Sequence, residues 1–180
     1  MKKTAAIILS LALLLGCAAG FAEAAEKAEL GTVNVNGAFK VQGKIPEGYQ
    51  LSIIQQTNTS IVCMLFPADK AKPTVTMSIA FAEDWADIER LNDVSEEDLA
   101  EIEASFESED VVNIEYRETG LGTKLMVVTE NIEEPDFVDI YTIYKGYEHE
   151  FVMTPGSEPL SEEHIQMMID FITEIDFVEM

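Results

Sequence analysis

Basic residues are scarce in this chain. Its 180 residues include 11 lysines and arginines against 34 aspartates and glutamates, which gives a formal net charge of −23 at pH 7. Nucleic-acid phosphates are bound by clustered lysine and arginine side chains, and the sequence contains no such cluster. The composition therefore argues against nucleic acids and anionic membrane surfaces as partners. It favours solubility, and it is compatible with cations or basic partners.

Cysteine and histidine are also scarce. The only cysteines are Cys17 and Cys63, and the only histidines are His149 and His164. Cys17 falls in or beside an N-terminal leader, so no internal disulfide is expected after processing. One cysteine and two distant histidines do not supply a usual zinc ligand set. We expect a domain that folds without disulfides, metals or cofactors.

Long apolar runs are confined to the N-terminus. Met1, Lys2 and Lys3 precede an almost unbroken apolar run from Ala5 to Leu15, which is the anatomy of an export signal. A spanning helix needs about 20 apolar residues, and neither this run nor any later one reaches that length. The sequence therefore predicts an exported chain, extracellular or associated with the cell envelope, and no integral membrane protein.

Two processing signals overlap in this leader. Ala22-Glu23-Ala24 is a small-x-small site, which would make residues 1–24 a signal peptide and release a soluble chain that begins at Ala25. Leu14-Leu15-Gly16-Cys17 resembles a bacterial lipobox, which would make residues 1–16 the leader and anchor the chain through a lipid on Cys17. Both alternatives stay open at this point.

The rest of the chain predicts a tether over residues 25–31 and one domain over residues 32–180. The clearest hairpin signal is Asn36-Gly37 between two short apolar segments, 32–35 and 38–41. Alternating apolar residues from Thr74 to Phe81 indicate a strand with one buried face. Further strands are expected over residues 49–55, 60–66, 112–116, 125–129, 137–144 and 147–153.

Two amphipathic helices are expected beside these strands. Ser95 begins a capping pattern, and helical spacing of apolar residues follows over residues 96–107. Ser161 begins a closing helix that carries apolar residues on one face, followed by a short tail over 175–178. A short helical turn is expected near Trp85, Ile88 and Leu91. The predicted fold is α+β: one antiparallel sheet of about seven to eight strands with both helices packed on it.

The exported leader, the turn Ile45-Pro46-Glu47-Gly48-Tyr49 into a strand, and a last helix that runs through Ile169-Asp170-Phe171-Ile172 into Ile175-Asp176-Phe177 resemble the PsbP-like family of α/β/α sandwich proteins. The resemblance covers roughly residues 38–178. It implies an accessory or binding role, because most members of that family are not enzymes. The chain lacks the basic surface with which photosynthetic members dock, so that role and its residues are not carried over.

Candidate catalytic residues are few. Cys63 lies in the middle of an apolar strand, where cysteine is usually an inert core residue, and no local signature supports a thiol nucleophile. His149 alternates with glutamates and His164 falls in the first turn of a helix, so we expect both to face solvent. Carboxylates are too abundant for any pair to be informative without a cleft. No catalytic residue is therefore assigned.

Two loops resemble ligand motifs in part. The segment from Asp93 to Asp98 begins like a calcium loop, but it has Asp98 where the sharp turn needs glycine and Ala104 where the bidentate glutamate belongs. We interpret it as the solvated start of a helix. Gly120-Leu121-Gly122 leads into a strand and not into a helix, so it indicates a hairpin turn and not a phosphate loop.

Aromatic residues gather in the hairpin around Lys145-Gly146. Tyr141, Tyr144 and Tyr147 form a contact surface if one face of this hairpin is exposed. If that face is covered, they belong to the hydrophobic core. The function expected from the sequence is a non-catalytic binding or accessory protein of the bacterial cell envelope, with an unknown protein or small ligand as partner. The alternative is a secreted hydrolase that uses carboxylates. A deep polar pocket favours the enzyme, and a flat exposed apolar patch favours binding.

Overall fold

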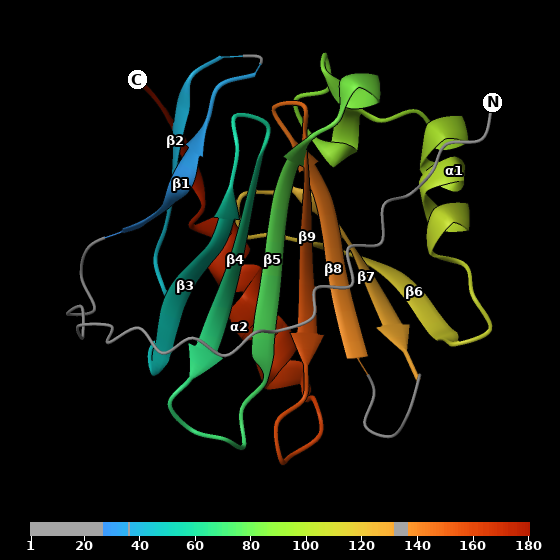
Figure 1. The fold of residues 1–180 in the computed structure, drawn as a ribbon. Coiled ribbons are helices and arrows are strands. Elements are labelled where there is room, and N and C mark those ends of the chain that lie inside the picture. Colours follow the sequence, from blue (N-terminus) through green and yellow to red (C-terminus); the bar gives the residue numbers. More distant parts are fainter. Residues whose placement is uncertain (1–26, 36, 132–136) are drawn as a thin grey trace.

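The computed structural model describes residues 27–35, 37–131 and 137–180 (Figure 1). The two leader-processing sites, with Cys17, and the turn residue Asn36 lie outside the described residues. Ten strands and two α-helices occur in the described part of the chain. The α+β class is confirmed, although strands dominate the fold. None of the helices described is both long and apolar enough to cross a membrane.

Seven strands form one antiparallel sheet with the order β3-β4-β5-β9-β8-β7-β6. Every neighbouring pair in this large sheet is antiparallel, and the middle strands pair along most of their length. Its members are β3 (Tyr49–Gln56), β4 (Ser60–Pro67), β5 (Thr74–Phe81), β6 (Val111–Glu118), β7 (Lys124–Glu130), β8 (Phe137–Tyr144) and β9 (Tyr147–Thr154).

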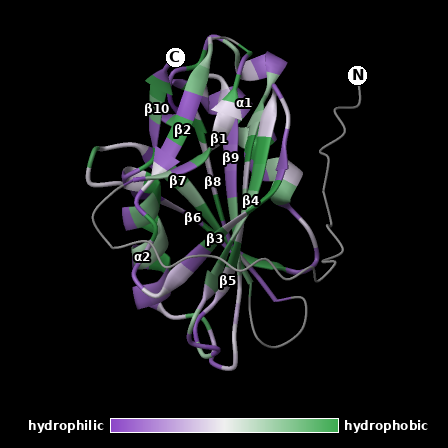
Figure 2. Cartoon of the chain, turned by 60° about the vertical axis from the view of Figure 1, so that its left-hand side comes forward, coloured by the Kyte–Doolittle hydropathy of each residue, from purple (hydrophilic) through white to green (hydrophobic). Residues whose placement is uncertain are grey.

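A second sheet has three strands in the order β1-β2-β10, which the prediction of one sheet missed. It contains β1 (Ala28–Val33), β2 (Phe39–Gly43) and β10 (Asp176–Glu179). The predicted hairpin is present, with Val33 opposite Phe39, but β1 begins at Ala28, inside the segment expected to be tether. Leu30 and Val33 are fully buried, which explains why this segment is ordered as a strand. Hydrophobic and hydrophilic residues alternate along β2, as expected when one face is buried (Figure 2).

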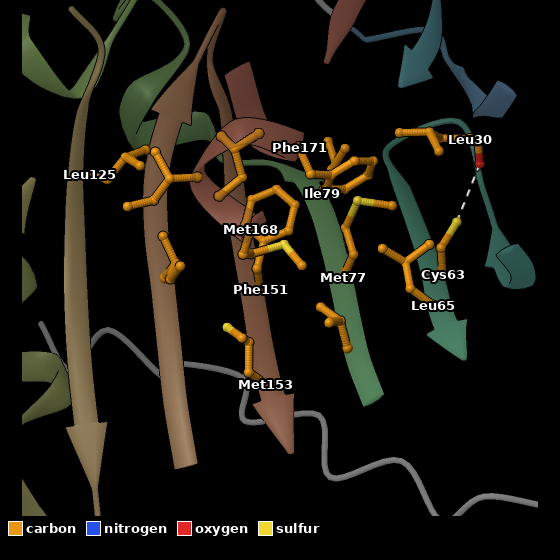
Figure 3. Packing of buried hydrophobic residues seen from close by; sticks show 14 of the residues in the cluster. Leu30, Cys63, Leu65, Met77, Ile79, Leu125, Phe151, Met153, Met168 and Phe171 are labelled. Carbon is orange, nitrogen blue, oxygen red and sulfur yellow. Dashed lines mark hydrogen bonds between the residues drawn. The ribbon is translucent and has the colours of Figure 1, made fainter. Parts of the chain in front are cut away.

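The helix α2 (Glu162–Thr173) and the small sheet cover one face of the large sheet, which we call the inner face. Its apolar side chains Ile165, Met168 and Ile169 are buried in the same core as those of β4, β5 and β9, and Figure 3 shows part of this packing. The guanidinium of Arg117 on β6 donates two hydrogen bonds to Glu162, at 2.8 and 3.1 Å. This pair joins the first turn of α2 to an edge strand.

The helix α1 (Glu96–Phe106) packs on the opposite, outer face. Its start is as predicted, because the Ser95 hydroxyl accepts a hydrogen bond from the Asp98 backbone at 3.1 Å. The expected helical turn before it consists of two 3-10 helices, η1 (Glu83–Trp85) and η2 (Leu91–Asp93). Together these elements bury a second core over β7 and β8, and in Figure 1 α1 lies at the β6 side of the sheet.

The outer face of β4, of β5 and of β9 beyond Glu148 has no α-helix over it in the described structure, and we call it the open face. Strand pairing places two rows of side chains across it. One row runs through Val62, Ser78 and Glu150, and the next runs through Met64, Thr76 and Val152. These side chains are half-buried, and Phe66 at the end of β4 is 41% exposed.

Candidate functional site

The tyrosines of the hairpin between β8 and β9 belong mainly to the interior. Tyr147 is fully buried and its hydroxyl donates a hydrogen bond to the Val35 carbonyl. Tyr141 is buried under α1, where its ring lies edge-on to Phe106 with centroids 5.5 Å apart. Tyr144 is half-buried and keeps part of its surface exposed. Tyr141 and Tyr147 are therefore core residues, and Tyr144 alone of the three keeps exposed surface that a partner could contact.

The prediction that His149 faces solvent is wrong. The side chain is 2% exposed, and its ring contacts those of Phe177, Phe151 and Tyr144. It points to the inner face, where β10 covers it. Burial lowers the pKa of His149 to about 3, which keeps the imidazole neutral.

The thiol of Cys63 has no catalytic partner among the described side chains. It is fully buried and donates a hydrogen bond to the Leu30 carbonyl at 3.4 Å. Burial raises the pKa of Cys63 to about 12. The strand β5 separates it from the strand of His149, and His164 is half-buried at the start of α2, where its Nδ1 accepts from the Ser161 N–H at 3.3 Å. The interpretation of Cys63 as a core residue is confirmed.

The two motif-like loops have local structural roles. The Asp93 carboxylate accepts from the backbone N–H of Arg90 at 3.1 Å, which closes the turn of η2. Residues 120–122 lie in the connection between β6 and β7, where the Thr119 hydroxyl accepts from the backbone of Thr123 at 3.1 Å, so this hairpin is confirmed. Among the residues described, no three Asp, Glu, His or Cys side chains are grouped so that they could hold a metal ion.

One carboxylate group that the sequence did not single out lies beside the open face. Asp139 on β8, Glu150 on β9 and Glu130 on β7 share the outer face on three neighbouring strands. We call these three residues the acid group. Asp139 and Glu150 are diagonal neighbours, because Asp139 is opposite Val152. Diagonal side chains on one face of a sheet lie within reach of each other.

Asp139 is the buried member of the acid group. It is 7% exposed, and its Oδ1 has no hydrogen-bond partner in the described structure. Burial raises the pKa of Asp139 well above its ordinary value. The charge of Glu150, a hydrogen bond shared with Glu150 and the charge of Glu130 raise it further, although a hydrogen bond from the Phe151 backbone opposes them. The pKa of Glu130 is raised as well, first by burial and then by Asp110 and Glu150.

Cations are missing from this region of the sheet. The five neighbouring strands β3, β4, β5, β9 and β8 contain no lysine or arginine, and their only acidic residues, Asp139, Glu148 and Glu150, all point to the outer face. Glu148 is engaged internally, because its Oε1 accepts from Trp85 Nε1 at 2.9 Å and from the Tyr141 hydroxyl at 3.0 Å. The open face thus combines an apolar stripe along β4 with the acid group at its β9 side.

Two shallow hollows lie elsewhere on the described surface. One, of about 150 Å³, is lined by residues that include Phe39, Ile88 and Lys145. The other, of about 270 Å³, is lined by residues that include Pro46, His164 and Met167. Both are smaller than the roughly 300–1,000 Å³ of ordinary ligand pockets. Neither includes a member of the acid group or of the open face.

No protein-family model matches this chain, and no curated protein matches it. The resemblance to PsbP-like proteins therefore stays a prediction.

Proposed function

We propose that this chain is an exported, non-catalytic binding or accessory protein of the bacterial cell envelope, and that the open face is its contact surface. The observation that carries the proposal is the uncovered middle of the large sheet, where Val62 and Met64 are half-buried and Phe66 is 41% exposed. A flat surface with an apolar stripe suits contact with another molecule better than it suits enclosed chemistry.

Export is supported by the charged start of the chain and its apolar run from Ala5 to Leu15. The test is the intact mass of the protein recovered from its own cells. We expect a chain that begins at Ala25 or at a lipid-bearing Cys17. A full-length chain from Met1 in the cytoplasm would remove the basis for an envelope role.

The contact surface is tested by photo-crosslinking in the native envelope. A photoreactive residue at Met64, on the open face, is compared with one at Glu163, on α2 at the opposite side of the large sheet. We expect a discrete adduct from position 64 that disappears when Phe66→Ser is added, and no such adduct from position 163. Equal labelling from both positions would show that the open face is not a specific contact surface.

A secreted hydrolase that uses carboxylates is the second candidate, and the acid group favours it. A carboxyl with a raised pKa beside a second carboxyl is an arrangement used in acid–base catalysis. Against it, Asp139 is nine-tenths buried and outside both hollows. A hydrolytic activity that Asp139→Asn abolishes in a folded protein would favour the enzyme.

A further inference from the structure

Ionisation of the buried Asp139 carboxyl lowers the stability of the protein when no partner is bound. A buried charge is normally paired, since an uncompensated one loses its hydration without a replacement. The charged groups that act on Asp139 are Glu150, which also shares a hydrogen bond with it, and Glu130, and both are acidic. Its Oδ1 has no partner in the described structure. The site therefore offers an unpaired acceptor, Asp139 Oδ1, in a region of negative potential. A bound cation would favour the ionised carboxyl and could supply its missing hydrogen bond.

A divalent metal ion does not fit this need. Calcium takes six to eight oxygen ligands and magnesium an octahedral set. No three acidic, histidine or cysteine side chains among those described, the acid group included, converge closely enough to hold a metal ion. An ammonium or guanidinium group requires fewer ligands, because two carboxylates can accept its hydrogen bonds.

The residues around the acid group indicate which side chains the partner carries beside its positive group. Val152 on β9 separates Asp139 from Thr76, and Met64 and Val62 continue the apolar surface onto β4. No lysine or arginine on these strands competes for the carboxylates. A partner that fits must present a positive group next to apolar side chains.

We propose that the acid group Asp139, Glu150 and Glu130 is the anchoring subsite of the open face, and that it binds a lysine or arginine side chain of a basic, partly apolar polypeptide segment. This inference rests on the proposed binding function and names the class of partner. Glu150, which is half-buried, is the member that reaches the cation directly. Asp139 lies beneath and supplies additional negative potential.

The experiment measures binding of a fluorescent peptide of alternating lysine and valine to the purified protein. Peptides with serine or glutamate in place of lysine are compared with it, and calcium chloride is tested alone at matched ionic strength. We expect binding of the lysine peptide only, weakened by salt. Glu150→Gln should weaken it about tenfold, the effect of losing one charge-assisted hydrogen bond.

A matched variant separates the site from the general negative charge of the protein. Glu163→Gln makes the same charge change on α2, which covers the inner face, and should alter the affinity less than about twofold, since a distant exposed charge is screened. Asp139→Asn, which keeps the shape of the side chain, serves as the second variant if Glu150→Gln folds poorly. Equal weakening by the variants on both faces would overturn the proposal.

The carboxyl carbon of Asp139, followed by NMR during a pH titration, provides a readout independent of affinity. The bound lysine peptide should lower the Asp139 pKa, because a nearby cation favours the ionised form. An unchanged pKa in the complex, or tighter binding of calcium than of the peptide, would refute a site for organic cations. If the adduct at position 64 persists while the acid-group variants bind the peptide normally, the proposed function stands and this inference fails.

Discussion

The imidazole of His149 lies against the ring of Phe177, with centroids 5.5 Å apart and planes inclined by 31°. This contact joins β9, in the middle of the large sheet, to β10 in the small sheet. It also explains why His149 is neutral, because an imidazolium at this position would be charged among aromatic rings and without solvent. The two sheets therefore meet around a histidine that must stay uncharged.

Acid should weaken the fold through His149. The pKa of His149 has its ordinary value of 6.5 in the unfolded chain and is lowered to about 3 in the folded protein. Between these two pH values the unfolded chain therefore binds more protons than the folded protein does. Stability should therefore fall as pH drops from 6.5 towards 3, by an amount on the order of a few kcal/mol. Urea unfolding at pH 7 and at pH 4.5 measures the loss. His149→Phe should show a flatter pH dependence, while His164→Gln, which leaves His149 in place, should retain the wild-type slope.

Asp139→Asn should stabilise the free protein at neutral pH. The folded pKa of Asp139 is raised, so its contribution to stability is lost as pH rises above the ordinary value of 3.8. The neutral amide removes this penalty, and we expect a gain on the order of 1 to 3 kcal/mol at pH 7. The gain should shrink towards pH 3.5. A variant that is less stable at pH 7 would show that the ionised carboxylate has a favourable partner.

Cys63→Ala should cost about 1 kcal/mol of stability, the usual loss for truncating a small buried side chain. The native thiol should react with a disulfide reagent only when the protein unfolds, because it is fully buried and its pKa is raised to about 12. Peptide binding should be unaffected by the substitution. Fast labelling of the native protein would contradict the core position of this residue.

Calcium should act on the acidic segment from Glu83 to Asp110 only as a salt. The carboxylate of Asp93 is used to close a turn and Ser95 caps α1, so neither is arranged around a cation. Screening relieves repulsion among exposed carboxylates whatever the ion, whereas a true site adds about 2.7 kcal/mol at a hundredfold excess over Kd. Melting curves with up to ~10 mM calcium, near the weak affinity of extracellular modules, and with sodium chloride at equal ionic strength should rise alike. A saturable rise with calcium alone would reveal an organised site.

Local chemistry was enough to predict most elements. The Asn-Gly turn, the Ser95 cap and the alternation from Thr74 to Phe81 each depend on neighbouring residues, and the structure confirms the elements they predict. The separate small sheet was missed because β2 pairs with β10, from the opposite end of the described chain. No local pattern specifies that pairing.

The environments of single residues were harder to predict. The glutamates at positions 148 and 150 suggested an exposed strand, yet His149 has the same parity as Tyr147 and Phe151, which are fully buried. Attention to that parity would have placed His149 correctly. Asp139 was a charged residue inside an apolar strand, and this was the available signal. How deeply it is buried depends on packing around the outer core, which the sequence of β8 alone does not reveal.

The central position of β2 in the small sheet affects the order in which the chain folds. It lies between β1 and β10, so the small sheet stays incomplete until the final residues are present. Pairings between distant segments form slowly, because a long loop must close before the contact is gained. Until β10 has formed, one edge of β2 therefore stays unpaired, and the hairpin of β1 and β2 must be held by its contacts with the large sheet. Completion of the small sheet would therefore be a late step in folding, and loss of β10 would expose an unpaired edge of β2.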